Sequence, residues 1–184
     1  MNNVRSYQGL EPQVANDAWI DETAVVIGNV QVGPQASIWP QSVVRGDIHR
    51  IEIGAGSNIQ DGCILHVSHD SRFLPGGAPT IVHDNVTIGH QAVLHGCEVH
   101  EHCLVGIGAR LLDRSVLKPR CMLAAGALVT PGVVLEGGYL YVGAPARRQR
   151  RLTDLEFEYL EYAAQHYIEL AIKHRMTVSL GLNA

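Results

Sequence analysis

Histidine is the residue type in this chain whose number and spacing could do chemistry. The sequence has ten histidines in 184 residues, and six of them lie between His66 and His100. His90 and His95 stand five residues apart, and His66 lies upstream of both. Three neutral imidazoles with an open fourth position are typical of a catalytic zinc site rather than of a structural one. Whether these three side chains can meet depends on the elements that carry them.

A six-residue period organises most of the chain. Aliphatic residues recur on this period from Ile20 to Val44, from Ile53 to Leu65 and from Val82 to Val129, and small or β-branched residues follow four positions later. The interruptions are a three-residue excess around His49, a loop at residues 70–79 and one five-residue step. A period of six matches neither an α-helix nor an alternating strand. It predicts short parallel strands joined by tight turns and wound into a solenoid.

The repeat resembles that of left-handed parallel β-helices, in which three hexapeptides form one triangular coil. We therefore expect an all-β solenoid with about six coils between Ile20 and Gly137. Residues 1–184 are predicted to form a single domain, with the β-helix at about 14–143 and one amphipathic α-helix at about 152–175 that packs back on it. Thr153 and Glu156 form a capping box at the start of this helix. Residues 177–184 are expected to be a frayed tail.

The register of the repeat determines how the three histidines can meet. His66 directly follows Leu65 and His95 directly follows Leu94, so the two histidines should stack on adjacent coils. His90 stands one hexapeptide before His95 and should lie on another face of the triangle. One site can then use all three residues only if chains pack around a threefold axis, so that His90 of one chain meets His66 and His95 of its neighbour. This predicts a homotrimer with its metal sites at the subunit interfaces.

Composition excludes several other classes of function. The net charge of −4 gives no reason to expect nucleic acid or an anionic membrane as a partner. No apolar run approaches the roughly 18 residues of a membrane span, and residues 1–8 do not read as a secretory signal, so a cytoplasmic location is expected. The basic run at 147–151 is interpreted as a solvated junction or a source of intersubunit ion pairs.

Four cysteines are expected to be thiols rather than disulfides in a reducing compartment. Cys63, Cys103 and Cys121 fall at the small position of the repeat, which indicates core packing. Cys97 lies two residues beyond His95, so its role stays open.

The chain is similar to γ-class carbonic anhydrases from Trp19 to about Tyr167. The matching segments are Val44-Arg45-Gly46-Asp47, Asn58-Ile59-Gln60-Asp61-Gly62, Leu65-His66-Val67, His90-x₄-His95-Gly96-Cys97 and Gly143-Ala144-Pro145. The hexapeptide period alone is not specific, because many acyltransferases share it. The three histidines together with the Arg-Gly-Asp and Asn-Ile-Gln-Asp segments are specific.

This resemblance implies an activity and a set of site residues. The implied activity is that of a zinc lyase, a carbonate dehydratase, which hydrates CO₂ reversibly to bicarbonate through a hydroxide held by the three histidines. His66, His90 and His95 match the zinc ligands, with His90 contributed across the subunit boundary, and Fe²⁺ or Co²⁺ are alternatives to Zn²⁺. Gln60 matches the amide that hydrogen-bonds the metal-bound water, with Asn58 on the same segment. The charged residues of the ion-pair network near the metal are matched by Arg45, Asp47 and Asp61.

The chain also departs from the best-studied members of the class. These carry two glutamates that serve proton transfer, whereas here Ile48 follows Asp47, and Asp70 is the only acid of the short loop. The chain thus resembles the short-loop branch of the family. His69 is a candidate proton shuttle, with a solvated loop histidine as the simpler interpretation.

Three other functions stay open. One is an acyl-CoA-dependent acyltransferase on the same solenoid, with a histidine as general base. The second is a thioesterase that uses the same metal site, and the third is a non-catalytic metal-binding trimer.

Overall fold

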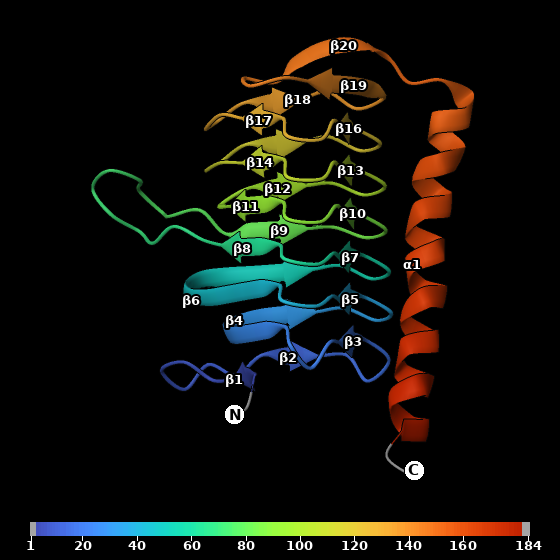
Figure 1. Cartoon of the computed structure of the whole chain (residues 1–184). Coiled ribbons are helices and arrows are strands. Elements are labelled where there is room, and N and C mark those ends of the chain that lie inside the picture. Colours follow the sequence, from blue (N-terminus) through green and yellow to red (C-terminus); the bar gives the residue numbers. More distant parts are fainter. Residues whose placement is uncertain (1–2, 182–184) are drawn as a thin grey trace.

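The chain forms a parallel β-solenoid with one long C-terminal helix, as the computed structural model shows for residues 3–181 (Figure 1). Side chains are described up to residue 177. The strands stack into three faces, which we name after one strand of each. Within the described residues, no helix is long and apolar enough to cross a membrane.

The β3 face consists of parallel strands capped by one antiparallel strand. Its members are β3 (Trp19–Ile20), β5 (Ser37–Ile38), β7 (Asn58–Ile59), β10 (Thr87–Ile88), β13 (Leu104–Val105), β16 (Met122–Leu123), β19 (Tyr139–Val142) and the antiparallel β20 (Arg147–Arg151).

The β8 and β9 faces belong to one continuous sheet that bends around a corner. The β8 face has β8 (Ile64–His66), β11 (Val93–His95), β14 (Arg110–Leu111) and β17 (Leu128–Val129), and the β9 face has β9 (Thr80–Val82), β12 (Glu98–Val99), β15 (Val116–Leu117) and β18 (Val134–Leu135). Two long strands, β4 (Val25–Val32) and β6 (Val43–Ile53), run through the corner and join the two faces. The short β1 (Val4–Arg5) and β2 (Gln13–Val14) pair with β4.

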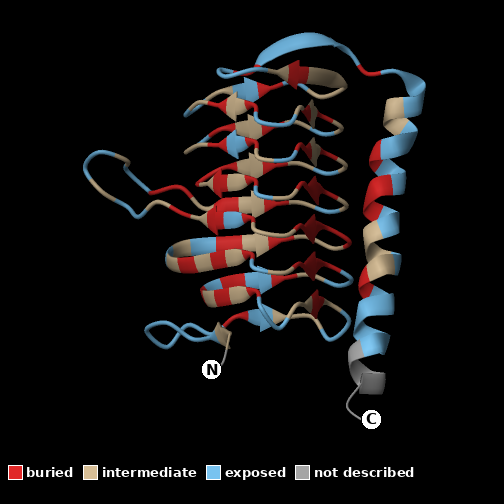
Figure 2. Ribbon diagram, viewed as in Figure 1, coloured by how far each residue is buried: buried red, intermediate tan, exposed pale blue. Residues whose placement is uncertain are grey.

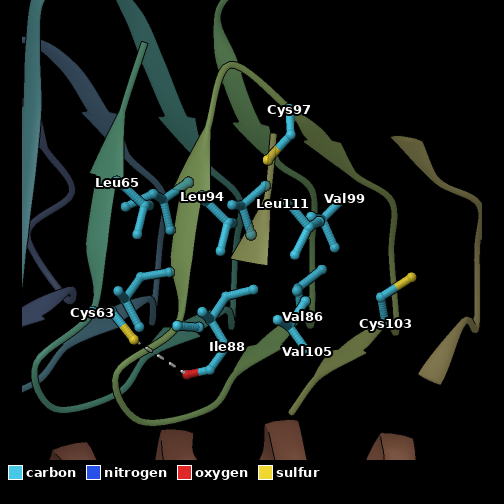
Figure 3. Close-up of a cluster of buried hydrophobic side chains, with 14 of the residues drawn as sticks. Cys63, Leu65, Val86, Ile88, Leu94, Cys97, Val99, Cys103, Val105 and Leu111 are labelled. Atoms are coloured by element: carbon cyan, nitrogen blue, oxygen red, sulfur yellow. Dashed lines mark hydrogen bonds between the residues drawn. The ribbon is translucent and has the colours of Figure 1, made fainter. Parts of the chain in front are cut away.

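The predicted repeat positions form the core. Every aliphatic position of the period is buried except Ile20, which is half-buried, and every small position is buried (Figure 2). Leu65, Leu94 and Leu111 illustrate the stacking of one position through three successive coils (Figure 3). This repeated burial of aliphatic area, worth about 25 cal/mol per Å², holds coil on coil without large aromatic side chains.

All four cysteines are buried thiols, which confirms the prediction for Cys63, Cys103 and Cys121. Cys97 is also in the core, at 2% exposure, so it is a packing residue (Figure 3). Burial raises the pKa of the Cys63 and Cys103 thiols to about 12 and raises the pKa of Cys97 and Cys121 further. These thiols are therefore protonated at neutral pH.

The excess near His49 and the loop lie at the same corner, between the β8 face and the β9 face. The excess near His49 is absorbed inside β6, whose first residues pair with β8 and whose last residues pair with β9. The predicted loop projects from the solenoid between β8 and β9 (Figure 1) and is closed by bridges from Ser68 to Ala78 and from Ser71 to Leu74. Neither interruption disturbs the register of the coils on either side.

The helix α1 (Asp154–Gly181) runs back along the β3 face, as the amphipathic pattern predicts (Figure 1). It buries Leu160, Ala163 and Ala171, but Leu155, expected on the same stripe, is 74% exposed. The helix also continues past the predicted end at 175. Of the tail expected at 177–184, residues 177–181 are helical and 182–184 lie outside the described residues.

The predicted capping box is present at the start of α1. The Thr153 Oγ1 accepts from the Glu156 backbone N–H at 3.3 Å, and the Glu156 carboxylate accepts from the Thr153 N–H at 2.9 Å. Arg150 binds the same carboxylate through two nitrogens at 2.7 Å. The Arg150 hydrogen bonds, followed by that from the Thr153 N–H, lower the pKa of Glu156 from 4.5 to about 2.

We expect Glu156→Gln to lower the melting temperature by a few degrees at pH 7, because the substitution removes the charge that Arg150 and the helix N-terminus stabilise. A lowered folded-state pKa contributes stability above the unfolded-state value and loses it as the pH falls through the folded-state value. The difference between the two proteins should therefore shrink between about pH 4.5 and pH 2. Thermal melts followed by circular dichroism measure it, with the exposed Glu158→Gln as control. A difference that is constant with pH would contradict this assignment.

Candidate metal centre

His66 and His95 lie side by side at the ends of two neighbouring strands of the β8 face. Strands β8 and β11 pair in parallel with Leu65 opposite Leu94 and His66 opposite His95, which confirms the predicted stacking. The His66 Nδ1 and the His95 Nε2 are 3.1 Å apart. Two ring nitrogens therefore converge on one point beside the solenoid.

A carboxylate holds the other nitrogen of each ring. The His66 Nε2 lies 3.1 Å from the Asp47 Oδ1, and the His95 Nδ1 lies 2.7 Å from the Asp113 Oδ1. Arg45 binds the second oxygen of Asp47, and the Ser68 hydroxyl donates to the second oxygen of Asp113 at 3.0 Å. Since a carboxylate only accepts, each ring carries its proton on the carboxylate side.

In the neutral form of these tautomers, the two nitrogens that face each other each present a lone pair. Lone pairs at 3.1 Å repel one another unless a cation lies between them. Two ligands at adjacent corners of a zinc tetrahedron would be about 3.3 Å apart, given Zn–N bonds of about 2.05 Å. The pair of His66 and His95, each oriented by a carboxylate, therefore fits a divalent metal ion.

The charge states of these groups suit a metal ligand. Burial lowers the pKa of His66, and hydrogen bonding to Asp47 offsets this only in part, so the imidazole is neutral at pH 7. Burial acts to raise the pKa of Asp47, but the hydrogen bonds from Arg45 and His66 outweigh it and hold that pKa below its usual value. A neutral ring beside an ionised carboxylate is the arrangement that favours metal coordination.

His90 lies at a different corner, just after β10 of the β3 face. Its Nδ1 is 2.9 Å from the Asp61 Oδ2, which leaves Nε2 as its open nitrogen. No hydrogen bond or ion pair among the described residues links His90 to His66 or His95. The third predicted ligand thus has the same carboxylate support as the first two but is not brought to them within one chain.

Gln60 and Asn58 belong to the His90 corner. The Gln60 Oε1 accepts from the His90 backbone N–H at 3.2 Å, and its Nε2 donates to the Asn58 Oδ1 at 3.1 Å. Asn58 in turn donates to the Thr87 hydroxyl at 3.1 Å. Gln60 is 5% exposed and retains one unassigned N–H. The network fixes this amide next to His90.

The predicted charged network is only partly formed within a single chain. Arg45 and Asp47 are paired, whereas Asp61 binds His90. The Arg45 side chain is 42% exposed, so it has room to reach a second carboxylate.

Asp113 and Gly96 are site residues that sequence reasoning missed. Asp113 stands one coil, or 18 residues, after His95, so the repeat itself could have identified it. Gly96 has φ of 59°, and a Cβ at this position would lie 2.4 Å from the Asp113 Oδ1. Only glycine allows that carboxylate to approach the ring of His95.

A cavity of about 420 Å³ opens beside His90 between α1 and the β3 face. Its lining combines His90 and Gln60 with apolar side chains, including Leu104, Ile107 and Tyr159. A molecule of moderate size can therefore reach the His90 corner.

Comparisons with known proteins agree with this fold. No family model matches the chain. It is 43% identical to protein YrdA of Escherichia coli over 90% of both chains, and 40% identical to carnitine operon protein CaiE of Salmonella agona over 95% of this chain and 84% of CaiE. It is also 43% identical to the mitochondrial gamma carbonic anhydrase 2 of Arabidopsis thaliana, over 89% of this chain and 58% of that longer protein.

Among solved structures, a hexapeptide transferase family protein from Anaplasma phagocytophilum superposes with a TM-score of 0.84 at 38% identity, over 91% of this chain and 95% of that one. The chain belongs to the γ-class carbonic anhydrase family of hexapeptide-repeat proteins. Its fold class, a left-handed parallel β-helix with a C-terminal helix, is confirmed.

We expect Asp113→Ala to weaken Zn²⁺ binding by about 10–100-fold, because His95 loses the partner that sets its orientation and proton position. Zinc affinity can be measured by competition with a chromophoric chelator. Asp70→Ala, which removes an exposed carboxylate of the neighbouring loop, serves as control. Equal zinc affinity in wild type and Asp113→Ala would contradict a metal at His95.

Proposed function

We propose that the chain is a metal-dependent carbonic anhydrase that hydrates CO₂ reversibly, with each metal site shared between two chains of a homotrimer. The ligands would be His66 and His95 of one chain and His90 of its neighbour, with Zn²⁺ as the expected ion and Fe²⁺ or Co²⁺ as alternatives. The observation that carries the proposal is the convergence of one ring nitrogen of His66 and one of His95 at 3.1 Å, with a carboxylate on the other nitrogen of each ring.

The arrangement of the faces supports a shared site. His90 stands at the corner where the chain enters the β8 face, and His66 and His95 stand where it leaves that face. The β8 face therefore lies between the two half-sites. Three β8 faces turned toward a threefold axis would bring the His90 corner of each chain beside the His66 and His95 corner of the next.

The side chains would divide the work between holding the ion and orienting the reactants. Asp47, Asp61 and Asp113 fix the three rings and keep their protons away from the shared point. When bound, the ion supplies a Lewis acid that makes a coordinated water acidic near neutral pH. The free N–H of Gln60 is placed beside His90 to orient the attacking water, and Asn58 holds that amide in place.

Proton export needs a group that exchanges with buffer. Ile48 is exposed and cannot carry a proton, and His69 is exposed on the loop that follows His66. His69 is therefore the candidate for this step. The metal-proximal charges Arg45 and Asp47 would stabilise the interface rather than exchange protons.

Thioester hydrolysis at the same metal site is the second candidate. It is favoured by the cavity of about 420 Å³ beside His90, which is larger and more apolar than CO₂ hydration needs. The relative CaiE is named for a carnitine operon. Acyl transfer from acyl-CoA would use the same cavity, with His90 as a base instead of a ligand. A non-catalytic metal-binding trimer is the remaining candidate, consistent with the missing glutamates.

Stopped-flow CO₂ hydration on metal-replete protein tests the proposal. We expect activity that is abolished in His66→Ala together with the metal bound at the shared site. In Gln60→Ala we expect kcat/KM to fall by roughly 10–100-fold at unchanged metal content, because an oriented hydrogen bond to a reacting group is lost. Gln165→Ala, on the exposed side of α1, is the matched control. A wild-type protein that is metal-replete but inactive with CO₂ and active with a thioester would establish the second candidate instead.

Mixed trimers test the shared site. We expect that His90→Ala and His66→Ala chains alone each bind less metal than the wild type, since each shared site lacks one ligand. Co-refolded together, some interfaces would combine an intact His90 with an intact pair of His66 and His95, and metal content should rise. Metal analysis combined with native mass spectrometry checks this. A mixture that forms mixed trimers without gaining metal would rule out the shared site.

A further inference from the structure

A second group of ligand-type side chains lies on the β9 face. His83, Glu98 and His100 place one ligand atom each within 4.8 Å of one another. The His83 Nε2 is 2.8 Å and the His100 Nε2 is 3.4 Å from the same oxygen of Glu98. The two imidazole rings are stacked, with centroids 4.6 Å apart and planes 6° from parallel.

The repeat brings these residues together in the same way as His66 and His95. Val82 and Val99 are register partners on β9 and β12, and His83 and His100 follow them directly. Glu98 points outward from β12 as the neighbour of Val99 and is opposite Ile81 of β9. Two adjacent coils therefore present two rings and a carboxylate in one row, within a single chain.

We propose that His83, Glu98 and His100 form a second site for a divalent transition-metal ion, such as Zn²⁺, Co²⁺ or Ni²⁺. Two imidazoles and one carboxylate are ligands that such ions accept, with water completing the coordination. The separations of 2.8 and 3.4 Å bracket the roughly 3.3 Å expected between tetrahedral ligand atoms. The three ligand atoms lie within 4.8 Å of one another, so they would draw together around the ion, which would displace the protons that the ring nitrogens share with Glu98.

The charges around the group favour a cation. The ion pairs of Glu98 are with His83 and His100, and Glu101 lies 3.8 Å from the His100 Nδ1. In the part of the chain described here, neither carboxylate forms an ion pair with Lys or Arg. Side-chain exposures of 38% for His83, 40% for Glu98 and 21% for His100 leave a path for an ion from solvent.

This site is separate from the first. His83 and His100 stand at the corner that leads from the β9 face to the β3 face, whereas His66, His90 and His95 stand at the two ends of the β8 face. In a trimer closed around the β8 faces, the corner with His83 would point away from the axis. The second site needs neither a second chain nor the proposed hydration activity.

The position of the site indicates its role. Strand β9 is where the chain rejoins the solenoid after the projecting loop at residues 67–79 (Figure 1). An ion held between His83 of this coil and His100 of the next would tie the rejoining strand to the coil above it. Because the unfolded chain does not preform the site, binding would stabilise the folded state by mass action.

Cobalt(II) binding tests the proposal in a background that lacks the first site. We expect His95→Ala protein to bind about one Co²⁺ per chain at the second site, detected by calorimetry and by visible absorption of the histidine-ligated ion, and to gain melting temperature on adding Co²⁺. Adding His100→Ala to this background should weaken binding by roughly 10-fold or more, because even loss of an outer hydrogen-bond partner of a ligand costs about that much. His95→Ala with His166→Ala, which removes an exposed helix histidine, should bind as well as His95→Ala alone.

The wild-type protein provides a second readout if the His95→Ala background folds poorly. Saturated wild type should hold one more Co²⁺ per chain than His100→Ala and one more than Glu98→Gln. Equal cobalt stoichiometry and affinity with and without His100, or an equal loss in the His166→Ala control, would overturn the proposal and leave a hydrogen-bonded His-Glu-His group. Loss of CO₂ hydration alone has no bearing on it.

Discussion

Coil-to-coil register is the constraint on which the rest of the structure depends. Each aliphatic position packs on its counterpart one coil away, and the strands between them pair in parallel with that same offset. A slip by one residue would turn the buried side chains outward, so the hydrophobic core itself locks the register. Polar residues next to an aliphatic position are therefore also placed opposite their counterparts on the adjacent coil. His66 and His95 are close for this reason, and so are His83 and His100.

Much of the fold follows from the period alone. The burial of the repeat positions, the loop after β8 and the packing of a C-terminal helix on the solenoid are all predictable from spacing and composition, whereas the choice of the β3 face is not. The end of α1 and the exposure of Leu155 are not readable in this way. Terminal helical turns form or fray according to small differences in local free energy. The sequence also does not show whether an apolar residue in the first turn of a helix has a packing partner.

For the candidate site, the sequence predicts which residues are register partners on adjacent coils. It does not predict which of their neighbours form side-chain contacts with them. The stacking of His66 on His95 follows from register, whereas the carboxylate behind each ring depends on rotamers and on the space left by neighbours. Asp113 lies at a one-coil offset, yet Gly96 is what permits its contact with His95. The family resemblance placed Asp61 in an ion-pair network with Arg45 and Asp47. Its contact with His90 could not be inferred from that motif.

The long helix changes how the solenoid loses structure. In a linear repeat array each coil touches only its neighbours, so terminal coils can open independently of the middle. Here α1 starts beside the last coils and returns to the first, where Trp19 and Trp39 pack around Tyr167 and Ala171. Opening the first coils therefore requires peeling away the helix, which also covers β7 and β10. The two ends of the array are coupled, and amide hydrogens near both ends should exchange through one shared, cooperative opening rather than by separate fraying.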